Sequence, residues 1–441
     1  MRFVPLGGGK EIGANSYLLQ VDGKNILIDC GRHPIKEGYE SLPAIDEIDK
    51  LDYVFISHSH YDHLSSLPHL VKFFPNVRVL TSRENKKLSV RILRNSVEVM
   101  KKKNEKDGEP ILYNHSDVKK AKKRMIGVEY YEPFKISKKL FVTFYPAGHV
   151  MGASSILLEY KGKKIFYTGD ISLSDQLTIP SAVLPDKVDV LISEGTYGLK
   201  EEATDTRHSE IRRLELSIKK VLKNKGRVLL PVFALGRGQE VLYMVLKMLD
   251  EEKIPDVPVY TNGMVSIITN LYLQEYAGMP PEKKRWFNNA ILRRVRTVPK
   301  NYKTLLYDKR PMILILSSGM LIEDTLSYLF AKEILQDNLS AIFFMGYQSP
   351  ESIGYSILEA ARSREEEISY GEERIQLRCT IKKFNFSGHA SYEELISLPR
   401  ELQPSKLVYV HGDEEALLNL AKELEYEFDI SVPSNLETVL L

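Results

Sequence analysis

The segment Ser57-His58-Ser59-His60-Tyr61-Asp62-His63 holds three of the ten histidines in this chain of 441 residues. It follows the short apolar run 53–56, which is typical of a buried strand. Alternate residues of an extended segment point the same way, so His58 and His60 can face one cation. Where the chain turns into a helix, Asp62 and His63 can face a second cation. Imidazole and carboxylate groups are ligands of zinc and similar divalent ions, so this segment predicts a metal site.

Three further histidines and two aspartates follow strand-like runs in the same manner. Asp29 and Asp170 stand in Leu27-Ile28-Asp29-Cys30-Gly31 and Tyr167-Thr168-Gly169-Asp170, and the histidines are His149, His389 and His411. Loops at strand ends are where rigid folds carry their sites. His149 can therefore join the first cation, and Asp170 can bridge two cations through its two oxygens. Taken singly, each residue is explained equally well as a capped turn residue or a hydrogen-bonded core residue.

The composition excludes several classes of protein. Hydrophobic residues make up 43% and charged residues 27% of the chain, which is unlike disordered or fibrous proteins. The longest apolar runs, such as 311–316 and 341–345, are far shorter than the roughly 20 residues of a membrane span, and no signal pattern opens the chain. Two cysteines, Cys30 and Cys379, are too few for a disulfide framework or a thiolate zinc site. We therefore expect a cytoplasmic protein with no membrane partner.

The pattern of the chain changes near Thr196. Before this point short strands dominate, and hairpins are predicted across Asp22-Gly23 and Lys161-Gly162. After it, predicted helices and strands alternate, at about 209–223, 227–231, 238–250, 259–261 and 312–316. This alternation is typical of a parallel sheet covered by helices. Strand character returns after residue 373, so we expect an α/β domain inserted into a β-rich one.

Positive charge is concentrated in two segments. Lys and Arg total 61 against 59 Asp and Glu over the whole chain, but segment 83–125 holds 14 basic and 6 acidic residues, and segment 282–310 holds 10 and 2. Each segment is either a solvated helix face or a surface for a polyanion. Trp286 and Phe287 lie in the second segment, where one of them either stacks on a nucleic-acid base or belongs to the core.

Together these motifs resemble those of a known enzyme family. The segment 57–63, with Asp29, His149 and Asp170, is similar to the signature of the metallo-β-lactamase superfamily. Three more motifs resemble its β-CASP nuclease branch, in order along nearly the whole chain: Ser193-Glu194-Gly195-Thr196-Tyr197-Gly198, Phe386-Ser387-Gly388-His389-Ala390-Ser391 and Val410-His411-Gly412-Asp413. The chain looks most like short archaeal and bacterial homologues of the endonuclease subunit of the cleavage and polyadenylation specificity factor.

The resemblance implies a fold of the α/β class, a four-layer αβ/βα metallo-β-lactamase domain with an inserted β-CASP domain. The implied limits are 1–199 and 374–441 for the two parts of the first domain and 200–373 for the inserted one. It also implies two zinc ions per chain, with Asp170 bridging them and Asp29 supporting their ligands. The first ion is bound by His58, His60 and His149, and the second by Asp62, His63 and His411.

The implied activity is hydrolysis of phosphodiester bonds in single-stranded RNA, which leaves 5′-phosphate and 3′-hydroxyl ends. A hydroxide activated by both cations attacks phosphorus, and His389 protonates the leaving oxygen while Glu194 orients it. Endonuclease and 5′–3′ exonuclease action both stay open. Turns at Ser317-Ser318 and Ser387-Gly388 either bind flanking phosphates or are ordinary turns. The chain starts directly with the metal domain, so RNA binding is expected from the cleft rather than from an N-terminal KH domain.

Three other functions fit parts of the pattern. Hydrolysis of a small ester, thioester or lactam is disfavoured, because a small substrate does not need an inserted domain with its own basic segment. A non-catalytic RNA-binding scaffold is disfavoured because seven buried polar ligands would be costly to keep without a metal. A DNA-processing nuclease of the same fold is the third alternative. The oligomeric state is open between a monomer and a homodimer in which segments like 436–441 pair across subunits, as in some relatives.

Overall fold

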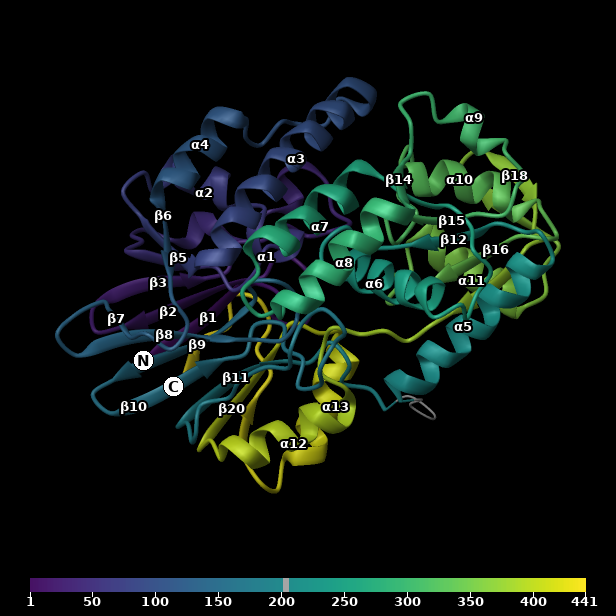
Figure 1. Ribbon diagram of the computed structural model, residues 1–441. Coiled ribbons are helices and arrows are strands. Elements are labelled where there is room, and N and C mark those ends of the chain that lie inside the picture. The colour runs from purple at the N-terminus through teal and green to yellow at the C-terminus, as the bar shows by residue number, and fades with distance from the viewer. Residues whose placement is uncertain (201–205) are drawn as a thin grey trace. The chain divides into compact units, whose positions relative to one another are not determined.

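The computed structural model describes residues 1–200 and 206–441, which form two compact units (Figure 1). The first unit consists of Met1–Asp175, Ser181–Glu201 and His389–Leu441, and the second of Gln176–Pro180 and Glu202–Gly388. The chain therefore leaves the first unit and later returns to it. The limits 1–199, 200–373 and 374–441 divide the chain by family domains rather than by compactness, and they stay a prediction.

Two seven-stranded sheets form the centre of the first unit. The first has the order β22-β1-β2-β3-β4-β5-β6, with β1 (Arg2–Gly7), β2 (Ser16–Val21), β3 (Lys24–Ile28), β4 (Tyr53–Phe55), β5 (Arg78–Ser82), β6 (Met125–Val128) and β22 (Val439–Leu440). The second has the order β21-β20-β11-β10-β9-β8-β7, with β7 (Phe134–Lys135), β8 (Leu140–Pro146), β9 (Ser154–Tyr160), β10 (Lys163–Tyr167), β11 (Val190–Glu194), β20 (Lys406–Val410) and β21 (Asp429–Ser431). Both predicted hairpins are confirmed, as β2–β3 and β9–β10.

Apolar side chains hold the two sheets together, and helices cover their outer faces (Figure 1). Alternate residues of a strand face opposite sides, so Tyr17, Leu19 and Ile28 enter the core between the sheets while Leu18 and Leu27 enter a second core under helices. The helices on the first sheet are α1 (Tyr61–Leu64), α2 (Leu67–Phe73), α3 (Arg83–Asp107) and α4 (His115–Arg124), and short 3₁₀ turns η1 (Gly38–Ser41) and η2 (Ile45–Glu47) precede them. The helices on the second are α12 (Tyr392–Leu402) and α13 (Glu414–Leu424).

The second unit is built on a parallel six-stranded sheet, with the order β14-β13-β15-β12-β16-β19. Its strands are β12 (Val228–Pro231), β13 (Val259–Thr261), β14 (Val295–Thr297), β15 (Ile313–Leu316), β16 (Ala341–Phe344) and β19 (Thr380–Lys383). One apolar core involves α5 (Arg207–Lys223), α6 (Arg237–Asp250), α7 (Gly263–Glu275) and α8 (Pro281–Arg294). Another involves α9 (Lys303–Leu306), α10 (Leu326–Leu335), α11 (Ile353–Arg362) and the hairpin β17 (Glu367–Tyr370) with β18 (Glu373–Gln376). The predicted fold class, a layered α/β metallo-β-lactamase fold with an α/β insert, is confirmed.

Two features of the structure concern the C-terminal strand, which was considered for pairing across subunits, and the helices, which were considered as membrane spans. The C-terminal strand β22 pairs with β1 of its own chain, with Phe3 opposite Val439, and β22 lies at the edge of its sheet. None of the helices in the described ranges combines the length and apolar character that a membrane crossing requires.

A buried arginine in the second unit generates a prediction about stability. Arg227 is fully buried, and its guanidinium donates to the carbonyls of Leu306 (2.8 Å) and Asp308 (3.2 Å) and contacts the Asp337 carboxylate (3.4 Å). Removing one partner of a buried charge network typically costs about 3 kcal/mol or more. We expect Arg227→Met to lower the free energy of unfolding of this unit by about that amount.

The single tryptophan, Trp286, lies in the same unit, so its fluorescence during urea unfolding measures the effect. Arg362→Met is the matched control, because the Arg362 side chain is 71% exposed and pairs with Glu359 along its own helix. Equal urea midpoints for the two variants would contradict the prediction.

Candidate metal centre

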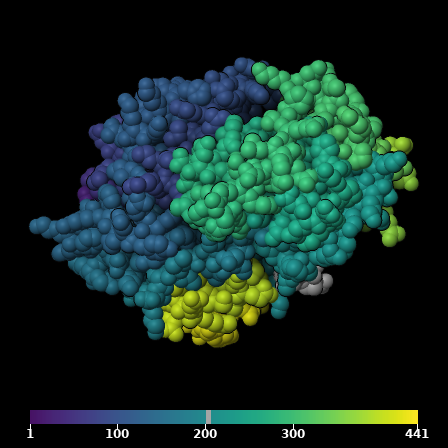
Figure 2. All heavy atoms as spheres, in the orientation of Figure 1, coloured from purple at the N-terminus to yellow at the C-terminus, as the bar shows by residue number. Residues whose placement is uncertain are grey.

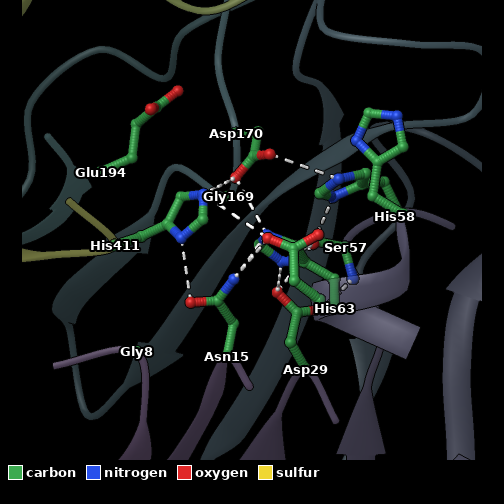
Figure 3. A network of polar contacts seen from close by, with 12 residues as sticks. Gly8, Asn15, Asp29, Ser57, His58, His63, Gly169, Asp170, Glu194 and His411 are labelled. Atoms are coloured by element: carbon green, nitrogen blue, oxygen red, sulfur yellow. Dashed lines mark hydrogen bonds and ion pairs between the residues drawn. The ribbon is translucent and has the colours of Figure 1, made fainter. Parts of the chain in front are cut away.

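The predicted metal-binding side chains all lie in the first unit, in loops that adjoin strands of its two sheets or, for Asp62 and His63, in helix α1. Asp29 directly follows β3, His58 and His60 lie between β4 and α1, and Asp170 follows β10. His411 directly follows β20, while Glu194 is the last residue of β11. Since these strands end at one edge of the layered structure, residues far apart in the sequence meet there (Figure 3).

One group of ligand atoms is formed by His58, His60, His149 and Asp170. The Nε2 atoms of His58 and His149 lie 3.3 and 3.5 Å from Asp170 Oδ2, and His149 Nε2 lies 3.0 Å from His60 Nδ1. Burial, with the neighbouring imidazoles, lowers the pKa of His60 to about 3 and lowers the pKa of His149 well below its usual value. These imidazoles are therefore neutral at physiological pH, as metal ligands must be.

A second group is formed by Asp62, His63 and His411. The Nε2 atom of His63 lies 3.5 Å from Asp62 Oδ2, and the Nε2 atoms of His63 and His411 each lie 3.2 Å from Asp170 Oδ1. Burial lowers the pKa of His411. Burial also opposes the charged form of His63, but the surrounding carboxylates outweigh it and raise the pKa of His63 well above its usual value. The negative charge around this group therefore favours a cation.

Asp170 lies between the two groups and offers a different oxygen to each (Figure 3). Burial disfavours its charged form, but the imidazoles around it outweigh burial and lower the pKa of Asp170 well below its usual value. Within the described residues, the buried atoms His58 Nε2 and Asp170 Oδ1 have no hydrogen-bond partner. Buried polar atoms without partners are rare, so these orphaned atoms, set among imidazole and carboxylate donors, fit divalent cations on both sides of Asp170.

Asp29 holds the ligand loops rather than facing the cation positions. Its carboxylate accepts hydrogen bonds from His63 Nδ1 (2.8 Å), the Ser57 backbone N–H (2.7 Å) and hydroxyl (2.7 Å), and the Tyr167 hydroxyl (2.8 Å). Because His63 Nδ1 donates in this bond, Nε2 is the ring nitrogen whose lone pair would face a cation. His58 Nδ1 lies 3.0 Å from the Ser57 hydroxyl. Because this hydroxyl donates its own proton to Asp29, it accepts from His58 Nδ1, and the Nε2 atom of His58 keeps its lone pair.

His389 and Glu194 form a pair beside the two groups. His389 Nδ1 lies 2.9 Å from both Glu194 oxygens, and His389 Nε2 lies 3.9 Å from Asp170 Oδ2. Burial alone would lower the pKa of His389, but the Glu194 and Asp170 carboxylates outweigh it and raise that pKa to about 9. Glu194 is itself held by the backbone N–H of Ile171 (2.8 Å). This pair can hold a proton at the edge of the centre.

The predicted phosphate-binding residues Ser317, Ser318, Ser387 and Gly388 lie in the second unit. The Ser317 hydroxyl accepts a hydrogen bond from Asn262 Nδ2 (2.6 Å), and the Ser387 carbonyl accepts one from Arg207 Nη2 (2.7 Å). The role of these four residues toward a substrate stays a prediction.

In the second basic segment, 282–310, several side chains that looked available for a polyanion have partners within the protein. In segment 282–310, Asp250 accepts from Trp286 Nε1 (2.9 Å) and pairs with Arg293 (3.1 Å) and Arg294 (3.3 Å). Phe287 is fully buried, so base stacking by Phe287 is wrong, because its ring belongs to the core of the second unit. Trp286 packs against the same core.

Two residues of the centre were missed by sequence reasoning. Ser57 and Asn15 are both buried, and Asn15 contacts Asp62, His63 and His411. Asn15 precedes strand β2, whereas the residues predicted from the sequence follow strands, and a single asparagine is a far commoner turn residue than a histidine cluster.

Three family models match successive parts of the chain: the metallo-beta-lactamase superfamily over residues 9–231, the Beta-Casp domain over 238–357, and the Zn-dependent metallo-hydrolase RNA specificity domain over 374–433. The chain belongs to the metallo-β-lactamase superfamily, in its β-CASP ribonuclease branch. Members of this superfamily bind divalent metal, so this β-CASP protein is a metal-dependent hydrolase.

Relatives match this β-CASP protein over nearly its full length. An RNase J-like protein of Methanocaldococcus jannaschii is 30% identical, over 94% of this chain and 93% of its own. The Probable RNase MJ4 of the same organism is 32% identical, over 98% of both chains. Cleavage and polyadenylation specificity factor 73 of Drosophila melanogaster is 29% identical, over 98% of this chain and 63% of its own. A solved structure of a protein of unknown function from Enterococcus faecalis V583 shares the fold, with a TM-score of 0.59, 18% identity and coverage of 100% and 99%.

The contacts of Asp29 generate a prediction about metal affinity. Asp29→Asn keeps the size of the side chain but replaces one accepting oxygen by a donor, so at least one of the bonds to Ser57, His63 and Tyr167 is lost. We expect metal affinity to fall about 10-fold to 100-fold, measured by competition with a chelator. Asp189→Asn is the control, because the exposed Asp189 accepts from the Lys164 backbone at the opposite ends of β10 and β11. Unchanged affinity in Asp29→Asn would show that the ligands need no such support.

Proposed function

We propose that this chain is a zinc-dependent ribonuclease that cleaves single-stranded RNA internally, at a centre of two zinc ions. The observation that carries the proposal is the division of the Asp170 carboxylate between two ligand groups, with a proton-holding pair beside it. Five imidazoles and two carboxylates make up these groups, a donor set that suits zinc better than magnesium or calcium. His58, His60 and His149 would hold one ion, Asp62, His63 and His411 the other, and Asp170 both.

When bound, a pair of zinc ions lowers the pKa of water and supplies a hydroxide nucleophile at neutral pH. Attack of such a nucleophile on phosphorus would break the bond to the 3′ oxygen, which would then need a proton. His389 Nδ1 donates to Glu194, so the Nε2 proton of His389 is the one available for the leaving oxygen. The products are a 5′-phosphate and a 3′-hydroxyl.

RNA as the substrate is supported by the match of residues 374–433 to an RNA specificity domain and by the relatives named as ribonucleases. Internal cleavage is supported by the similarity to an Endoribonuclease YSH1 of Gibberella zeae, which is 28% identical. The complete set of ligand side chains argues against a scaffold that only binds RNA, because such a buried polar cluster is costly without a metal.

The direct test uses metal-stripped protein with and without added zinc, on single-stranded RNA labelled at the 5′ or the 3′ end. We expect zinc to restore cleavage, with products of intermediate length from both labels. His389→Ala is expected to cut about 10²-fold to 10⁴-fold more slowly, with its zinc content unchanged, since His389 is not among the proposed ligands.

His115→Ala is the matched control, because His115 is an exposed histidine of the same unit that pairs with Glu98. RNA binding without cleavage in zinc would favour the scaffold, and faster cleavage of single-stranded DNA would favour a DNA-processing nuclease. Shortening only from the 5′ end would replace internal cleavage by exonuclease action. A wild-type rate in His389→Ala would remove the proposed proton donor.

We also propose that the RNA backbone follows one face of α3. Asn85, in the first turn of α3, accepts a hydrogen bond from the Ser59 hydroxyl (2.6 Å), and Ser59 lies between His58 and His60. From this start the helix runs for 25 residues. Helical spacing places five exposed basic residues on one face of α3, together with the exposed Glu98 and Glu105, and the part of the chain around residue 100 lies on the surface in Figure 2. The five basic residues are Arg83, Lys87, Arg91, Arg94 and Lys102.

A charge reversal on this face tests its role. Arg91→Glu with Arg94→Glu should weaken binding of a long single-stranded RNA about tenfold or more at low salt and reduce the dependence of affinity on salt. Cleavage of a very short oligonucleotide should be unchanged, because it does not reach the middle of α3. Lys138→Glu with Lys139→Glu makes the same charge change at exposed residues between β7 and β8. If both double variants lose the same affinity, only net charge matters and the assignment to α3 is wrong.

A further inference from the structure

Asn15 connects the three ligands of the second group through a single buried side chain (Figure 3). It directly precedes β2 and is fully buried. Its Nδ2 atom lies 3.1 Å from Asp62 Oδ2 and 2.9 Å from His63 Nε2, and its Oδ1 atom lies 3.0 Å from His411 Nδ1. One amide thus reaches residues 47, 48 and 396 positions away in the sequence.

The chemistry of these partners decides how the amide is oriented. An ionised Asp62 carboxylate only accepts hydrogen bonds, so the NH₂ group of Asn15 must face it. The amide oxygen then faces His411, and His411 Nδ1 must carry the proton that Asn15 Oδ1 accepts. The Nε2 atom of His411 is therefore left with its lone pair, which points toward Asp170 Oδ1 at 3.2 Å. Asn15 sets for His411 the same tautomer that Asp29 sets for His63.

The backbone holds Asn15 in this place. Its N–H donates to the Asp62 carbonyl (2.9 Å), and its carbonyl accepts from the Gly31 N–H (3.0 Å). The His411 N–H donates to the Gly8 carbonyl (2.9 Å). Gly8 has a φ of +73°, and a Cβ there would come within 2.1 Å of Asn15 Oδ1, so only glycine allows this approach. The backbone of Asn15 is therefore held from both sides, and its amide lies close against Gly8.

We infer that Asn15 is a positioning residue for the second cation, one that sets the affinity of the site formed by Asp62, His63 and His411. The inference rests on the two-cation centre of the proposed function. Asn15 acts through the ligands in two ways: it fixes the lone pair of His411, and it orients the Asp62 carboxylate. Partners of metal ligands typically change metal affinity 10-fold to 100-fold when they are removed.

The test is a titration of metal-stripped protein with zinc against a chromophoric chelator, which resolves the two binding steps without any RNA. Wild type should bind two ions. Asn15→Ala and Asn15→Leu should bind the first ion with wild-type affinity and the second about 10-fold to 100-fold more weakly. The leucine fills the volume of the amide, so the same loss in both variants assigns the effect to hydrogen bonding rather than to packing.

Asn25→Ala is the matched control, because Asn25 lies on β3, the partner strand of β2, and bonds there to Gln20 and Lys50. It should bind both ions as wild type does. Two ions with unchanged affinity in both Asn15 variants would overturn the inference alone. Equal weakening of both ions, or failure of both variants to fold, would overturn it in favour of a general structural role. A wild-type titration that ends at one ion would overturn it together with the two-cation centre.

Discussion

The first unit gathers buried carboxylates and imidazoles around Asp170, a concentration of buried charge that fits divalent cations. Asp170 is almost fully buried, and its two oxygens face different groups of imidazole nitrogens. Taking carboxylates and imidazoles out of water is costly unless they form hydrogen bonds or ion pairs, and among the described residues His58 Nε2 and Asp170 Oδ1 have no hydrogen-bond partner. The sheets and loops around Asp170 therefore keep these side chains buried although their polar groups would be better solvated in water.

The sandwich of two sheets makes this possible because its strands place apolar side chains in the core, while most of the metal-binding side chains lie just past the strand ends. Phe55, Tyr167 and Val410 lie in the core between the sheets, and the ligand loops begin one to three residues later. Two left-handed residues, Asp29 (φ 60°) and His411 (φ 52°), turn the chain sharply at strand ends. Such backbone conformations are uncommon outside glycine and concentrate at functional sites.

The features that depend on neighbouring residues in the sequence could be predicted from the sequence. Three histidines and an aspartate within seven residues of a buried strand cannot easily be anything but a metal site, and two-residue turns such as Asp22-Gly23 determine their hairpins within a dozen residues. What was missed depends on long-range contacts. Asn15 differs from any turn asparagine only through partners that the fold brings to it, and the basic segment 282–310 looked available until folding placed Asp250 against Arg293 and Arg294. The resemblance to a family supplied the roles that no local pattern contains.

The central claim is that Asp170 lies between two cations held by separate groups of ligands. It is tested most directly by a crystal structure of zinc-loaded protein, with diffraction data recorded on both sides of the zinc absorption edge. We predict two anomalous peaks per chain, one among His58, His60 and His149 and one among Asp62, His63 and His411, with Asp170 bound to both. A single peak, or peaks away from these side chains in fully loaded crystals, would contradict it.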